Sequence, residues 1–71
     1  MLYIIKRKDG YYFKSYKDCL NTLPHLVKTL KNARVFKTIE DAMEVFSRIK
    51  KVKPEYSISL IELKEEIILE D

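Results

Sequence analysis

The sequence predicts an α+β fold, a small mixed β-sheet in ββαβαβ order with helices on one face. Three observations support this prediction. Asp9-Gly10 separates two apolar, β-rich runs, which is the strongest short-range signal for a β-hairpin. Two later stretches repeat apolar residues at helical spacing, and a final stretch alternates apolar and polar residues. With 71 residues, the chain is expected to be one domain spanning residues 1–71.

The N-terminal hairpin should pair residues 2–5 with residues 11–16. Two registers fit the sequence: a two-residue turn pairs Lys8 with Tyr11, and a three-residue loop pairs Arg7 with Tyr11. The single glycine can take a positive φ in this loop. We prefer the three-residue loop because a one-residue slip moves every side chain to the other face. It places Tyr3, Ile5, Tyr11 and Phe13 on the core face, and Ile4, Lys6, Tyr12, Lys14 and Tyr16 on the opposite face.

A short helix is predicted over residues 23–31. Its apolar residues follow the i, i+3, i+4, i+7 spacing of one helical face; they are Leu23, Leu26, Val27 and Leu30. Pro24 suits the first turn, where its missing N–H costs nothing, and Thr22 or Asn21 can cap the helix.

A short strand is predicted over residues 33–37, followed by a second helix over residues 39–50. Thr38 is a suitable N-cap, and Glu40 and Asp41 fall in the first turn, where the helix dipole favours acids. The helix carries an apolar stripe, made of Ile39, Ala42, Met43, Val45, Phe46 and Ile49. This is the helix that the sequence specifies most strongly.

The alternation of residues 56–63 predicts a last strand, which ends at the charged residues 64–66. Residues 67–69 are apolar and fit a strand continuation, a second strand or a helical turn. If the strands 33–37 and 56–63 share a sheet, their helical crossover should be right-handed. The residues expected to be largely buried are Ile5, Phe13, Leu26, Leu30, Val35, Phe36, Ala42, Val45, Phe46, Ile49, Ile58 and Leu60.

The run Ala33-Arg34-Val35-Phe36-Lys37-Thr38-Ile39-Glu40-Asp41-Ala42, preceded by a tyrosine-rich hairpin, resembles small uncharacterised proteins of bacteriophages and mobile elements. The similarity covers the hairpin and residues 33–50. It implies a small accessory protein that acts on host machinery. It carries over no catalytic residues.

No enzyme, metal or cofactor chemistry is expected. Cys19 and His25 are the only residues of their kinds, so one chain cannot build a Cys/His zinc site, and a Cys–His nucleophilic pair lacks a third orienting group. A single glycine rules out a glycine-rich phosphate loop. The acidic residues of the C-terminal part lack the spacing of a calcium loop and are expected to be solvated; they are Glu62, Glu65, Glu66, Glu70 and Asp71.

The composition favours the cytoplasm, or the host cytoplasm for a phage-encoded protein. A small domain with one cysteine has no internal disulfide, which secreted domains of this size usually need. The apolar residues near the N-terminus precede their basic cluster, the reverse of a signal peptide. No apolar run approaches the roughly 20 residues that cross a bilayer, so no membrane role is expected.

The charge distribution points to binding. Residues 1–37 hold nine Lys and Arg against two acids, and residues 38–71 hold five against nine. The expected function is stoichiometric protein–protein interaction, including self-association, because tyrosine and arginine are enriched in interfaces. The resemblance to phage proteins implies that the partner is a host protein, which this chain would modulate or inhibit. The alternative is a nucleic-acid-binding module in which aromatic rings stack on bases and lysines neutralise phosphates. The candidate partner-binding residues are Lys6, Arg7, Lys8, Tyr12, Lys14, Tyr16 and Ile68.

Overall fold

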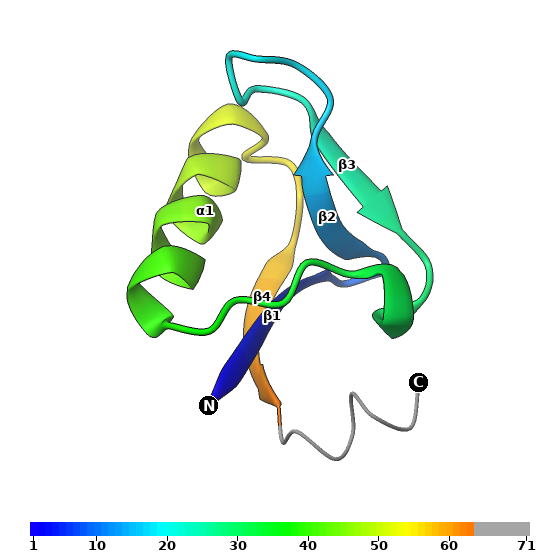
Figure 1. Cartoon of the computed structure of the whole chain (residues 1–71). Helices are drawn as coiled ribbons and strands as arrows, with labels where there is room; N and C mark the ends of the chain where they lie inside the picture. Colours follow the sequence, from blue (N-terminus) through cyan, green and yellow to red (C-terminus); the bar gives the residue numbers. More distant parts are fainter. Residues whose placement is uncertain (64–71) are drawn as a thin grey trace.

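The computed structural model describes residues 1–63, so Ile68 and the other residues of the C-terminal run lie outside the described part. An antiparallel sheet of four strands, in the order β3-β2-β1-β4, packs one face against a single α-helix (Figure 1). The α+β class is confirmed, whereas the mixed ββαβαβ order with several helices is wrong. The elements are β1 (Leu2–Arg7), β2 (Tyr12–Tyr16), β3 (Pro24–Val27), the 3-10 turn η1 (Leu30–Asn32), α1 (Ile39–Val52) and β4 (Ile58–Leu63).

The hairpin between β1 and β2 has the predicted three-residue loop. Lys6 pairs with Tyr12, and the Arg7 N–H donates to the Tyr11 carbonyl at 2.7 Å. The Gly10 N–H donates to the Arg7 carbonyl at 2.9 Å, and Gly10 has a φ of 97°. The glycine therefore occupies the bulge position, where a left-handed conformation is required.

The predicted helix over residues 23–31 is wrong: this stretch forms β3, followed by η1. Leu26 pairs with Phe13 and Pro24 pairs with Tyr16, so β3 completes the ladder of β2. A helix over residues 23–31 is shorter than the roughly 12 residues at which an isolated helix becomes stable in water, so pairing with β2 prevails. Pro24 is tolerated because it is the first residue of an edge strand, where no ladder N–H is needed.

A β-bulge in β2 changes which side chains face α1. Phe13 pairs with Leu26 and Ser15 pairs with His25, so the register shifts between them. Lys14 is therefore an extra residue of β2 that has no partner of its own in β3. The Tyr16 ring consequently lies on the core face, 5.1 Å from the Phe13 ring between centroids. The prediction that Tyr16 lies on the open face is therefore wrong.

The predicted strand over residues 33–37 is reduced to one bridge, between Tyr3 and Phe36. The Arg34 N–H donates to the Phe13 carbonyl at 2.9 Å, so this segment lies between β1 and β2 where the bulge turns β2 away. Phe36 and β4 are both antiparallel to β1 on its opposite sides, and therefore run parallel to each other. The predicted strand–helix–strand unit is therefore wrong, because no strand forms over residues 33–37, and only the direction of the chain at Phe36 relative to β4 agrees with it.

Helix α1 begins at the predicted residue, Ile39, and ends at Val52, two residues beyond the predicted end. The Thr38 hydroxyl accepts a hydrogen bond from the Asp41 N–H at 3.2 Å, and Glu40 and Asp41 fill the first turn. At the other end the Lys53 N–H donates to the Ile49 carbonyl. No helix among the described residues has both the length and the apolar character needed to cross a membrane.

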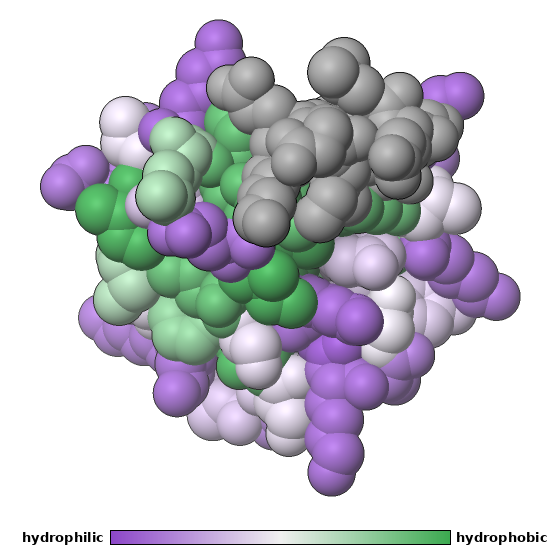
Figure 2. Space-filling model, turned by 90° about the horizontal axis from the view of Figure 1, so that it is seen from below, coloured by the Kyte–Doolittle hydropathy of each residue, from purple (hydrophilic) through white to green (hydrophobic). Residues whose placement is uncertain are grey.

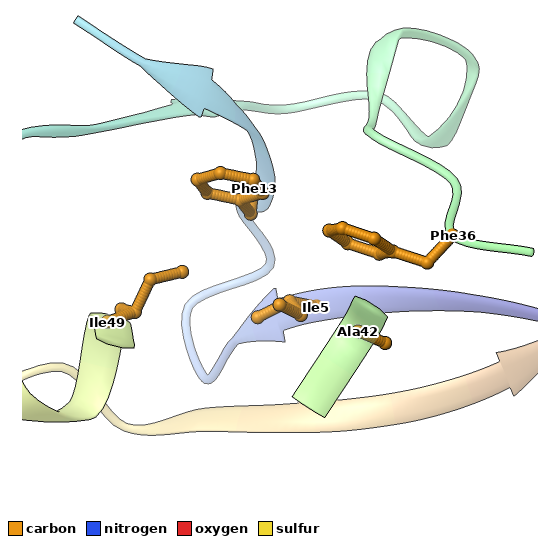
Figure 3. Close-up of a cluster of buried hydrophobic side chains, with 5 residues drawn as sticks. All are labelled: Ile5, Phe13, Phe36, Ala42 and Ile49. Carbon is orange, nitrogen blue, oxygen red and sulfur yellow. The ribbon is translucent and has the colours of Figure 1, made fainter. Parts of the chain in front are cut away.

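The core lies between α1 and the sheet (Figure 3). Its cluster of fully buried residues contains Ile5, Phe13, Phe36, Ala42 and Ile49, all of which were predicted. The other seven predicted residues are only half-buried, because a domain of this size cannot cover every apolar side chain. Ile4 is only 2% exposed, although the predicted hairpin register puts it on the face opposite the core. It pairs with Ile61 of β4.

Candidate partner-binding site

The structure separates the predicted partner-binding residues into three places. Lys6, Tyr12 and Lys14 lie on the sheet face turned away from α1, which we call the outer face. Arg7 and Lys8 lie at the hairpin end. Tyr16 lines a hollow beside α1, and Ile68 lies outside the described residues.

The outer face combines charge with one aromatic ring. The Lys6 Nζ atom lies 5.7 Å from the centroid of the Tyr12 ring, within the range of a cation–π contact. Tyr12 is half-buried and Lys14 is exposed. This face therefore offers an anchored aromatic ring flanked by cations, and no helix among the described residues covers it.

At the hairpin end, Arg7 is held by neighbours of this chain. Its Nε and NH2 atoms donate to the two carboxylate oxygens of Asp9 at 2.9 and 2.8 Å. The guanidinium lies 5.2 Å from the Tyr11 ring and 4.7 Å from the Tyr56 ring. The hydrogen bond to Asp9 raises the pKa of Arg7, and the same bond lowers the pKa of Asp9. Arg7 thus joins the hairpin to the segment before β4, which is a structural role.

Lys8 stands beside a shallow hollow at the same end of the molecule. Its N–H donates to the Ser57 carbonyl at 2.7 Å, which fixes the backbone, while its side chain is exposed. The hollow measures about 550 Å³ and is lined by Arg7, Lys8, Asp9, Glu55, Tyr56 and Ser57. Its charges are mixed, so it does not select a ligand of one sign.

A second hollow lies between α1 and the β2–β3 loop, and we call it the helix–loop hollow. It measures about 500 Å³ and is lined by Tyr16, Asn21, Glu44, Val45, Ser47, Arg48 and Lys51. Arg48 connects its two walls: Nε donates to the Asn21 carbonyl at 3.2 Å and NH2 donates to the Leu20 carbonyl at 2.9 Å. The guanidinium is therefore held in one orientation at the rim.

The Tyr16 hydroxyl is a buried polar group without a hydrogen-bond partner among the described residues. Burial raises the pKa of Tyr16, against the opposing effect of the Arg48 charge. The phenol is therefore neutral at physiological pH and keeps its O–H donor. A shielded donor of this kind costs free energy unless a partner satisfies it.

The β2–β3 loop is fixed by Asp18. Its carboxylate accepts hydrogen bonds from the backbone N–H groups of Thr22 and Leu23, each at 2.9 Å, and from the Thr22 hydroxyl. The hydrogen bond from the Thr22 hydroxyl makes the largest contribution to a lowered pKa of Asp18. The loop held in this way exposes Leu20 by 70% and Leu23 by 47%.

Cys19 and His25, the residues considered for catalysis and metal binding, both lie on the surface. Cys19 is exposed in the β2–β3 loop and His25 is exposed on β3. Within residues 1–63, no three or more His, Cys, Asp or Glu side chains are grouped so that they could hold a metal ion.

Sequence reasoning missed the helix–loop hollow. Asp18, Asn21 and Thr22 are residue types whose side chains often hydrogen-bond to the backbone in turns. This pattern is typical of an ordered loop rather than of the start of a helix. Nothing local marks Arg48, because its partners are backbone carbonyls that only the folded chain brings close.

No protein-family model matches the chain, and no curated protein or solved structure matches it significantly. The candidate sites therefore stand on the geometry of this chain.

Proposed function

We propose that this protein is a small binding protein that acts by stoichiometric protein–protein interaction. The observation that carries the proposal is the exposure of large apolar side chains on a domain whose fully buried core is small. Among residues 1–63, six hydrophobic residues form the buried core, whereas five large ones are exposed. The exposed ones are Met1 (79%), Leu20 (70%), Leu23 (47%), Met43 (42%) and Ile39 (39%).

These apolar side chains lie at opposite ends of the molecule. Leu20 and Leu23 belong to the β2–β3 loop, while Met1 and Ile39 lie near the N-terminus and at the start of α1 (Figure 1). Seen from below the view of Figure 1, hydrophobic residues gather over one part of the surface (Figure 2). A contiguous exposed apolar patch next to charged residues is typical of a protein-binding surface, whereas scattered single residues are not. Leu20 and Leu23 share one loop and are the pair that fits this description best.

The charge of the described part favours an acidic partner. Residues 1–63 hold thirteen Lys and Arg against seven Asp and Glu, and within them the ion pair is Arg7–Asp9. Unpaired cations on the surface attract an acidic partner and speed the encounter. On the resemblance to phage proteins, the partner is a host protein whose activity this chain modulates.

Nucleic-acid binding is the second candidate, and the same basic excess supports it together with the outer face. Lys6 and Lys14 flank Tyr12 there, as in surfaces that combine phosphate contacts with a stacking ring. Tyr12 is half-buried and Lys6 lies over its ring, which leaves less ring surface for a base. We therefore rank this function second.

Capture from an extract of cells that carry the gene separates the two candidates. The tagged chain should retain a protein at a fixed ratio after nuclease treatment. Tyr12→Ala and Leu20→Ser should lower the recovery, whereas Ser59→Ala, an exposed change on β4, should not. Recovery of nucleic acid alone, with a binding constant that falls linearly with salt on a log–log scale, would overturn the proposal.

A triple change of Lys6, Lys8 and Lys14 to Glu provides a second comparison. For a protein partner, it should mainly slow association and change the salt dependence. For nucleic acid, it should abolish binding, because those cations supply the phosphate contacts.

A further inference from the structure

The rim of the helix–loop hollow carries a guanidinium with unused donors. Arg48 has five N–H groups, and two of them are bonded to the carbonyls of Leu20 and Asn21. The loop therefore holds the guanidinium in place, and three N–H groups have no partner among the described residues. An oriented guanidinium is the side chain best suited to bind a carboxylate.

Further donors line the same hollow. Lys51 lies one helical turn after Ser47 on α1, and both line the hollow with Arg48. Glu44 contributes the one acidic group of the lining. Two positive charges against one negative charge give the lining a net positive charge, which favours an anionic ligand.

Tyr16 supplies an independent indication. Its side chain lines the hollow, and its hydroxyl has no partner among the described residues. A phenylalanine at this position would fill the same space without an unsatisfied donor. An acceptor oxygen that entered the hollow and reached this buried hydroxyl would satisfy its donor.

Leu20 indicates which kind of residue the partner carries next to the oxygen that enters the hollow. Its carbonyl accepts the Arg48 hydrogen bond, so its backbone is part of the rim, while its side chain is 70% exposed. The Asp18 hydrogen bonds fix this loop before any partner arrives. A preorganised loop loses little conformational entropy on binding, which increases the affinity for a partner.

We propose that the helix–loop hollow binds a carboxylate side chain of the partner protein, next to a large apolar residue that packs on Leu20. Arg48 and Lys51 neutralise the carboxylate, and Tyr16 donates to one of its oxygens. This inference rests on the proposed protein-binding function and specifies one surface that carries it.

The test is an NMR titration of the 15N-labelled full chain with two short peptides, acetyl-Leu-Glu-amide and acetyl-Leu-Gln-amide. The Glu peptide should shift the amides of Asn21, Ser47 and Arg48 in a saturable way. The Gln peptide should bind about tenfold more weakly, as expected for the loss of one charge-assisted hydrogen bond.

Two matched variants locate the site. Lys51→Met and Tyr16→Phe should each weaken binding of the Glu peptide while leaving the Arg48 hydrogen bonds to the loop in place. Lys50→Met is the control, because the Lys50 ammonium lies 5.5 Å from the Phe46 ring and the residue does not line the hollow. Equal shifts with both peptides, equal shifts with inorganic phosphate, or equal binding by the Lys51 and Lys50 variants would overturn the inference.

Failure of this inference and failure of the proposed function give different experimental results. If Tyr16→Phe and Lys51→Met capture the cellular partner as well as the unmodified chain does, the hollow is not the carboxylate site, while protein binding stands. If the chain captures no protein although the Glu peptide binds selectively, the proposed function fails and the hollow is a carboxylate site of another kind.

Discussion

Tyr3 and Phe36 exchange two backbone hydrogen bonds, of 2.9 and 2.8 Å, which join β1 to the segment before α1. The Phe36 ring stacks on the Phe13 ring with centroids 6.3 Å apart and planes inclined by 15°. Phe36 is therefore attached to β1 through its backbone and to β2 through its side chain, and it fills the space where the two strands diverge.

Phe36→Ala should be among the most destabilising single changes in the chain. A buried phenylalanine replaced by alanine costs about 3–5 kcal/mol, which approaches the whole free energy of unfolding of a domain this small. Phe46→Ala should cost less, about 1–2 kcal/mol, because Phe46 is half-buried. Urea unfolding followed by circular dichroism measures both, with exposed Met43→Ala as the control. Equal costs for Phe36 and Phe46 would contradict the burial described here.

Gly10→Ala should destabilise the hairpin by about 1–2 kcal/mol through backbone strain. The φ of 97° is unfavourable for a residue with a Cβ atom, whereas the space around Gly10 is open. Gly10→Asn should cost less, because asparagine tolerates positive φ better than alanine does. Thermal unfolding of the two variants measures the difference, and an alanine variant at least as stable as the asparagine variant would show that strain is not the cause.

Asp18→Asn should lower stability at neutral pH and have little effect in acid. The folded-state pKa of Asp18 is lowered, so its carboxylate stabilises the fold above the ordinary Asp pKa of about 3.9. This contribution is lost as the pH falls through the lower folded-state pKa. Unfolding measured between neutral pH and acid should show the variant and the original chain converging, while Glu62→Gln serves as an exposed control. A difference that stays constant across this range would contradict the role given to the carboxylate.

Tyr16→Phe should leave stability unchanged or raise it, by about 1 kcal/mol, because it removes a buried hydroxyl without a partner among the described residues. Tyr16→Leu is the comparison, since it also removes the ring that contacts Phe13 and should destabilise the fold. Both are measured by denaturant unfolding without any ligand. A clearly destabilised phenylalanine variant would mean that the hydroxyl is already satisfied in the free protein.

The elements predicted correctly are those that local chemistry determines. Gly10 fixes the register of the hairpin through its positive φ, and Thr38 fixes the start of α1 through its cap. Both signals lie within a few residues of the structure that they specify, so the sequence reveals them without knowledge of the rest of the chain.

The elements predicted wrongly depend on distant contacts. Leu23, Leu26 and Val27 fit one face of a helix, but pairing with β2 makes residues 24–27 a strand. The bulge near Lys14 has no local glycine signal, and it moves Tyr16 to the core face. Tertiary pairing overrides helical periodicity in such short windows.

The candidate site was predicted in part. Sequence composition drew attention to Lys6, Tyr12 and Lys14, which the structure places on one face. It also drew attention to Tyr16, which the structure places in the helix–loop hollow with Arg48. The remaining residues of that hollow come from two segments that are far apart in the chain, so no local pattern could group them.

The position of β1 between β2 and β4 has a consequence for the order in which the sheet forms. β1 and β4 are far apart in the sequence, yet Leu2 pairs with Leu63 and Ile4 pairs with Ile61. The hairpin can form early, because its contacts are local. The other edge of β1 stays unpaired until the distant β4 reaches it, so a folding chain exposes an open apolar strand edge until this long-range pairing completes the sheet.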